Sequence, residues 1–100
     1  MSIPVSAPET WRITQGCQLL WHTWDEEYVI FNTSSGDTHL LDKVSGEILK
    51  ILEEQSTDLA QLVVKSVERL GLDPNPANTS RIEDLIAKFC ELDLIEPALP

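Results

Sequence analysis

The chain has 100 residues, 42% of them hydrophobic, and a formal net charge of −10. This length suits one small domain with its own core. Seven Lys and Arg against seventeen Asp and Glu argue against nucleic-acid binding, which relies on neutralised phosphates, and against docking on anionic membranes. No stretch approaches the ~20 apolar residues of a membrane span, and the N-terminus lacks the features of a secretory signal. Because the two cysteines form no paired motif, we expect a reduced, cytoplasmic protein.

The acidic residues are concentrated in the middle of the chain. Residues 25–58 hold nine acids and two bases, a net charge of −7, with a run at Asp25, Glu26 and Glu27. Short charge runs of this kind are usually solvated turns. The alternative is a surface that attracts a basic partner.

Three strands are expected in the first half of the chain. Residues 1–16 contain two prolines and predict a flexible arm. Large, aromatic and β-branched residues then predict strands over 17–24, 27–32 and 38–41. The residues between them are turn formers, so the strands form an antiparallel meander.

The hydrophobic period changes from 2 to 3.6 after residue 41, which predicts helices. Asp42 is a suitable N-cap for the first helix, and Thr57 for the second. Gly71 stands where a left-handed residue would end the second helix. Ser80 and Glu83 form a capping box that predicts the start of the third helix.

The predicted order of elements is βββααα, which is typical of an α+β fold. It consists of a three-stranded antiparallel sheet followed by three helices, in a winged-helix-like arrangement. We assign the domain to residues 17–96, after the arm, and a short tail to residues 97–100.

Candidate catalytic or metal-binding residues are few. His22 and His39 are the two histidines, and they stand at no spacing typical of a site. Together with Cys17 and Cys90 they carry no zinc-ligand signature. There is no Gly-rich phosphate loop, and a chain this short leaves little room for a substrate pocket. We therefore expect no metal, no cofactor and no enzymatic activity.

A winged-helix shape raises the possibility of DNA binding. The recognition helix of a DNA-binding protein carries basic residues. The third predicted helix has Arg81 and Lys88 but also three acids, Glu83, Asp84 and Glu91. Its net charge is negative, so we expect no nucleic-acid partner.

The third predicted strand, 38–41, ends the meander and offers an open edge. Its sequence, Thr-His-Leu-Leu, has none of the lysines or prolines that usually block such edges. An extended peptide could add there as a further strand. The alternative is that the edge is simply short, or that the N-terminal arm covers it.

The run from Thr38 to Asp42, followed by Val44, Gly46 and the Ile48-Leu49 pair, resembles the PqqD family. In that family a strand ending in leucine and a polar cap leads into a helix with an Ile-Leu pair. The resemblance covers about residues 17–95. It implies a winged-helix-like peptide chaperone, or recognition element, that binds a leader or precursor peptide. Such proteins deliver the peptide to a modifying enzyme, often a radical iron–sulfur enzyme.

The resemblance also implies a binding site, in which the peptide lies along the third strand beside the third helix. By this resemblance, the residues that would pair with the peptide backbone are Thr38, His39, Leu40 and Leu41. The helix wall would comprise Arg81, Ile82, Leu85, Ile86, Lys88 and Phe89. Helical spacing alone also places the apolar members of this set in the core, and the two basic residues are equally consistent with solvated charges. His39 either contacts the peptide or faces solvent.

The run Gly36 to Leu41 is most similar to PqqD-like proteins of the HPr-related kinase system. The turn 33–37 departs from the Pro-Glu-Gly-like turn of quinone-pathway PqqD proteins, which implies a different peptide. An interaction domain for a folded partner, such as an HPr kinase-like protein, is the alternative function. The sequence is compatible with a monomer or a swapped dimer.

Overall fold

The structure is a computed structural model that describes residues 10–98 of the chain. Its helices are α1 (Lys43–Glu54), α2 (Leu59–Leu70) and α3 (Pro76–Glu91). Its strands are β1 (Thr10–Ile13), β2 (Leu19–Trp24), β3 (Glu27–Asn32), β4 (Thr38–Leu41), β5 (Thr57–Asp58) and β6 (Ile95–Ala98). The fold is α+β, as the sequence predicts.

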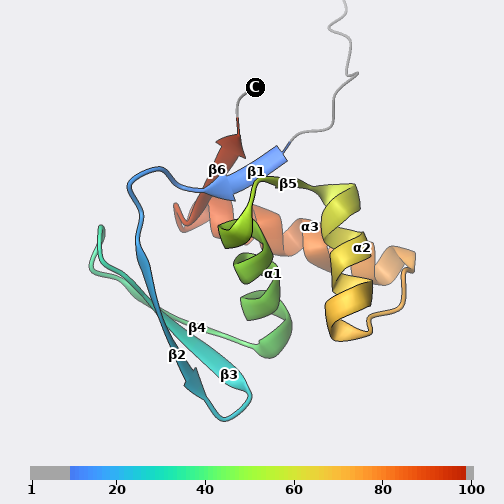
Figure 1. Ribbon diagram of the computed structural model, residues 1–100, viewed down its shortest axis with the longest axis horizontal. Coiled ribbons are helices and arrows are strands. Elements are labelled where there is room, and N and C mark those ends of the chain that lie inside the picture. Colours follow the sequence, from blue (N-terminus) through green and yellow to red (C-terminus); the bar gives the residue numbers. More distant parts are fainter. Residues whose placement is uncertain (1–9, 99–100) are drawn as a thin grey trace, which may run out of the picture.

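The predicted meander is confirmed. Strands β2, β3 and β4 form one antiparallel sheet in that order, with β3 in the centre and β4 at one edge. Gly36 adopts a φ of 81° in the turn before β4, a conformation that glycine tolerates without strain. In Figure 1 this sheet extends to one side of the molecule, and the helices lie on one face of it.

A second small sheet was not predicted. Its strand order is β5-β1-β6, with β1 antiparallel to both neighbours. Strand β1 lies within the range 1–16 assigned to an arm, and β6 continues past residue 96. Arg12 and Glu96 stand opposite each other and form an ion pair at 2.7 Å. These strands are too short to show a period, and their partners are far away in sequence, so local patterns do not reveal them.

Two helix starts differ from the prediction. Asp58, not Thr57, caps α2, because its Oδ1 accepts the backbone N–H of Gln61 at 2.8 Å. Helix α3 begins at Pro76 with Asn75 as its N-cap, four residues before the capping box at Ser80. Proline suits the first turn of a helix, where its missing N–H has no partner to lose.

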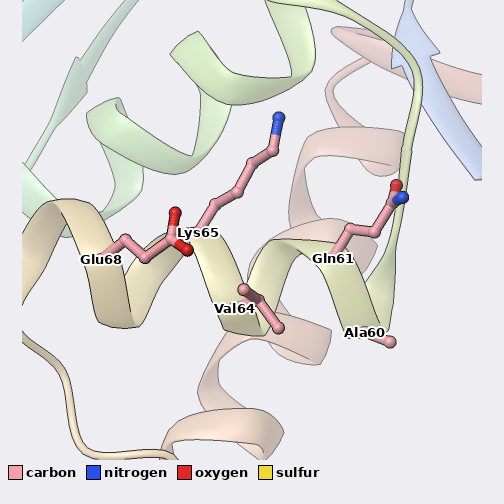
Figure 2. A pocket seen from close by; sticks show the side chains of 5 residues that line it. All are labelled: Ala60, Gln61, Val64, Lys65 and Glu68. Atoms are coloured by element: carbon pink, nitrogen blue, oxygen red, sulfur yellow. The ribbon is translucent and has the colours of Figure 1, made fainter.

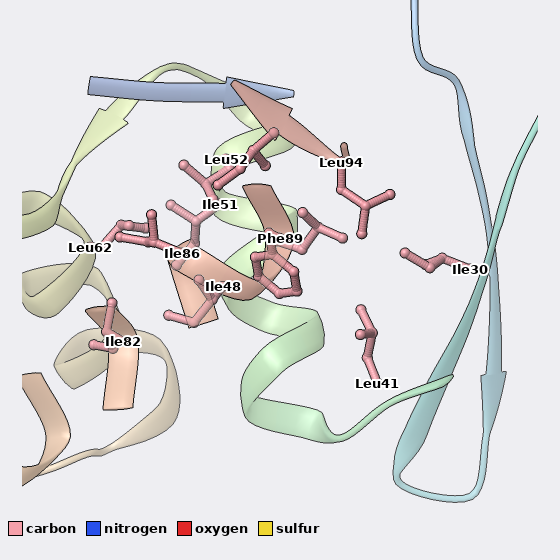
Figure 3. Close-up of a cluster of buried hydrophobic side chains, with 12 residues drawn as sticks. Ile30, Leu41, Ile48, Ile51, Leu52, Leu62, Ile82, Ile86, Phe89 and Leu94 are labelled. Carbon is pink, nitrogen blue, oxygen red and sulfur yellow. The ribbon is translucent and has the colours of Figure 1, made fainter. Parts of the chain in front are cut away.

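One hydrophobic core joins the helices to the meander. Its twelve buried members are Ile30, Leu41, Ile48, Leu49, Ile51, Leu52, Leu62, Ile82, Ile86, Phe89, Leu94 and Ile95. Figure 3 shows Ile30 and Leu41 pointing from the sheet toward the helices. The inner face of β3 and β4 is thereby fixed against the rest of the molecule.

Tyr28 of β3 attaches the meander to α1. Its hydroxyl donates to Glu47 Oε1 at 2.6 Å, and its ring meets Trp21 edge-on with centroids 5.6 Å apart. The Lys50 Nζ lies 4.3 Å from the ring centroid. The ring also lies directly over Gly46, where a Cβ atom would overlap it. Glycine is therefore required at this position for the sheet to approach the helix so closely.

Candidate functional site

The outer edge of β4 carries backbone groups without a strand partner. The N–H of Asn32 donates to the carbonyl of Asp37 at 2.8 Å, and hydrogen-bonded pairs alternate along an antiparallel ladder. Continuing the register, Thr38 and Leu40 are the residues whose N–H and C=O groups point away from β3. No other described strand pairs with this edge.

Of the other three sheet edges within residues 10–98, those of β5 and β6 are poorly suited to strand addition, whereas that of β2 is open. In β6, the bonded pair of Thr14 and Leu94 sets a register in which Pro97 has its ring nitrogen on the outer edge. Proline cannot donate a hydrogen bond, so it blocks strand addition there. Strand β5 has only two residues. Strand β2 has an open edge too, at Trp21 and Thr23, which provides a natural comparison for β4.

The side chains of β4 alternate between two environments. Leu41 is buried in the core, and His39 is half-buried on the same face, opposite Ile30. The Nε2 atom of His39 is buried and has no hydrogen-bond partner within the described part of the chain. Leu40 and Thr38 are exposed on the other face. A buried polar atom without a partner is uncommon and would gain from a ligand that supplied one.

Helix α3 is linked to Asp42, the residue that directly follows β4. Asp42 caps α1 by accepting the Ser45 N–H at 2.8 Å, and its other carboxylate oxygen lies 3.7 Å from Arg81 Nη2. The hydrogen bond from Ser45 lowers the pKa of Asp42, and the charges of Arg81 and Lys88 lower this pKa further. Both basic side chains of α3 are therefore close to the end of the open edge.

The six predicted wall residues divide into two groups. Ile82, Ile86 and Phe89 are buried in the core. Arg81 and Lys88 are exposed and Leu85 is half-buried. These three follow one another at four- and three-residue intervals, so they share one face of α3. Asp42, which directly follows β4, forms an ion pair with Arg81 on this face. The sequence identified Asp42 only as a helix cap. Its position directly after an open strand was the signal that could have placed it in the candidate site.

A hollow occurs elsewhere, on the outer face of α2. It is lined by Ala60, Gln61, Val64, Lys65 and Glu68 (Figure 2). All five belong to one helix, and no second element converges on it with polar groups, as a specific small-molecule site would require.

The described residues show no metal-binding cluster, and the Cys17 thiol has a raised pKa. Within residues 10–98 no three His, Cys, Asp or Glu side chains are grouped so that they could hold a metal ion. Burial raises the pKa of the Cys17 thiol, and the nearby Glu53 charge raises it further. A reactive cysteine needs a lowered pKa.

None of the three helices within residues 10–98 has the length and apolar character of a membrane span.

The Cys17 environment yields a kinetic prediction. In a Cys90→Ser background, Glu53→Gln should speed alkylation of Cys17 by iodoacetamide at pH 8 by about twofold to fivefold, since a solvent-screened charge contributes up to about 1 kcal/mol. Glu54→Gln, which changes the net charge equally, should leave the rate unchanged. Equal rates for all three proteins would show that Glu53 has no influence on this thiol.

The capping role of Asp42 predicts a stability change. Asp42→Ala should lower the free energy of unfolding by about 1 kcal/mol through loss of the cap, measured by urea denaturation at pH 7. Asp42→Asn keeps the cap and removes the charge. Asp42→Asn should therefore lose less unfolding free energy than Asp42→Ala. This loss should be fully present above the pKa of Asp42 in the unfolded chain, and it should vanish as the pH falls through the lowered pKa of Asp42 in the folded chain. A deficit that grew toward acid pH would contradict this.

Comparisons with known proteins show the fold. No family model matches the chain, and a search of curated proteins found no match. The solved structure of TbiB1 in complex with the TbiA(beta) leader peptide matches with a TM-score of 0.67 and 20% sequence identity. The match covers 89% of this chain and 99% of that chain. The two chains therefore share one fold over nearly their whole lengths.

Proposed function

We propose that this chain is a PqqD-like peptide-binding module that takes up a leader or precursor peptide as an additional strand beside β4. The observation that carries the proposal is the open edge at Thr38 and Leu40, which lacks a proline or lysine and ends beside the basic face of α3. A strand added there finds two N–H donors and two C=O acceptors already in register. The shared fold with TbiB1, a protein solved with a leader peptide, supports this function.

The surroundings of the edge supply side-chain recognition. The unpartnered Nε2 of His39 would bond a polar group of the peptide. Leu85 would contact an apolar side chain, while Ile82, Ile86 and Phe89 support this wall from the core. Arg81 and Lys88, both exposed on α3, would attract a carboxylate of the peptide. Hydrogen bonds between the two main chains set the register of the peptide, and each contributes about 0.5–1.5 kcal/mol to the binding free energy.

The module itself performs no chemistry in this proposal. It holds the peptide and presents it to a folded peptide-modifying enzyme, of which radical iron–sulfur enzymes and an HPr kinase-related protein are the candidates that the family resemblance implies. Cys17 is poorly suited to act as a nucleophile because its pKa is raised. No step in holding or presenting a peptide requires a metal or a cofactor.

The test is an NMR titration of the ¹⁵N-labelled full-length chain with short synthetic peptides from proteins encoded beside it. We expect shifts at Thr38–Leu41 and on α3 at Arg81, Leu85 and Lys88. A scrambled peptide of equal composition is the control. If no peptide causes shifts but an intact neighbouring protein binds, the chain is instead an interaction domain for a folded partner.

A further inference from the structure

The outer face of the meander is an apolar surface that no other helix or strand within residues 10–98 covers. Residues on this face alternate with those that face the core. Four large side chains are substantially exposed on it: Leu20 (60%), Trp24 (64%), Phe31 (38%) and Leu40 (65%). Leu20 stands directly opposite Phe31, and Leu40 stands opposite Val29, so apolar side chains are neighbours across all three strands. The helices lie on the other side of the sheet (Figure 1).

The charges around this outer face are of one sign. From residue 19 to residue 41 the chain contains no Lys or Arg. The β2–β3 turn at one end of the sheet carries Asp25, Glu26 and Glu27, and the β3–β4 turn at the other end carries Asp37. An exposed apolar patch with a charged rim is typical of a protein interaction surface. The acidic rim selects for a basic counterpart.

We infer that the outer face docks on a folded partner whose apolar surface is flanked by Lys and Arg, and that this partner is the enzyme that acts on the bound peptide. The inference rests on the proposed function for the identity of the partner. Leu40 explains the coupling, because its backbone lies on the peptide edge while its side chain belongs to the docking face. An enzyme seated on this face would lie directly beside the added strand.

A second copy of this chain is a poorer occupant of the same face. Two aligned sheets packed face to face would bring acidic turns together at both ends, in the parallel and in the antiparallel orientation. Each chain also carries a formal net charge of −10. Like charges placed against each other oppose association, so the charge distribution favours a basic partner over self-association.

The test measures binding of each folded protein encoded beside this chain, purified singly, to the full-length chain by titration calorimetry. For the protein that binds, Leu20→Asn and Trp24→Asn should each weaken binding at least tenfold, as expected for exposed anchors in an interface. Val64→Asn, which alters an apolar side chain 56% exposed on α2, is the matched control and should have no effect. Neutralising Asp25, Glu26 and Glu27 as Asn, Gln and Gln should reduce the salt dependence of binding. Asparagine suits position 25, where φ is 55°, because it tolerates the left-handed conformation.

The outcomes separate this inference from the proposed function. Leu20→Asn should weaken binding of the folded partner and leave peptide binding unchanged, whereas Leu40→Pro should weaken peptide binding. If none of the neighbouring proteins binds, or if Val64→Asn weakens binding as much as Leu20→Asn, the docking face is refuted while peptide binding can still stand. If a folded partner binds through this face and no peptide binds, the docking face stands and the peptide function fails. Self-association seen by analytical ultracentrifugation and abolished by Leu20→Asn would also refute it.

Discussion

Gly46→Ala should destabilise the protein by about 1–3 kcal/mol, although the same change in an ordinary helix stabilises by about 1 kcal/mol. The reversal comes from Tyr28, whose ring occupies the space that the new methyl group needs. This ring cannot move freely, because Trp21, Glu47 and Lys50 hold it on three sides. Urea denaturation monitored by circular dichroism measures the change.

A double-mutant cycle identifies the cause of the Gly46 effect. Tyr28→Ala removes the ring, so adding Gly46→Ala to it should cost much less than the single change costs in the wild-type chain. Because Tyr28 pairs with Leu41 across the sheet, the single variant should also weaken peptide binding at β4. A Gly46→Ala protein as stable as wild type would show that the sheet does not depend on this close approach.

Leu40→Pro should weaken peptide binding by roughly 30-fold or more. The Leu40 N–H points away from β3, so proline removes a donor to the added strand without breaking a bond inside the sheet. Loss of that bond, with the peptide carbonyl left unpaired, costs about 2 kcal/mol or more. Fluorescence anisotropy with a labelled peptide measures the affinity, and circular dichroism confirms that the variant is folded.

Thr23→Pro is the matched control for Leu40→Pro. Thr23 lies on β2, at the opposite edge of the same sheet, and its N–H also points away from β3. Proline there imposes the same local constraint without touching the proposed site, so peptide affinity should remain within about twofold of wild type. If Thr23→Pro abolishes binding and Leu40→Pro does not, the peptide adds to β2 instead.

Much of the fold could be predicted because its signals are local. Strand β3 combines β-branched and aromatic residues, Asp42 marks the start of α1, and Gly71 ends α2 in the left-handed conformation with a φ of 68°. The start of α3 was placed too late because Asn75 and Pro76 read equally well as a loop. A proline stops a helix when it lies inside one but begins a helix when it lies in the first turn.

The second sheet and part of the site could not be predicted from local patterns. Strand β1 pairs with β6 across 84 residues at Arg12 and Glu96, and no periodicity records such a pairing. The stripe on α3 predicted apolar positions but not how deeply each of them is buried. Only the three-dimensional packing shows that Ile82 is buried while Leu85 and Lys88 lie near the surface.

The pairing of β1 with β6 has a consequence for how the chain folds. It joins segments near the two ends of the described chain, whereas β2, β3 and β4 are neighbours in sequence and close short loops. Contacts between distant segments form more slowly than local ones, since a longer loop must be ordered first. We therefore expect the β2-β3-β4 sheet, with the proposed peptide edge at β4, to form early and the β5-β1-β6 sheet to form last. The second sheet would then join the two ends of the described chain only after β4 has already formed.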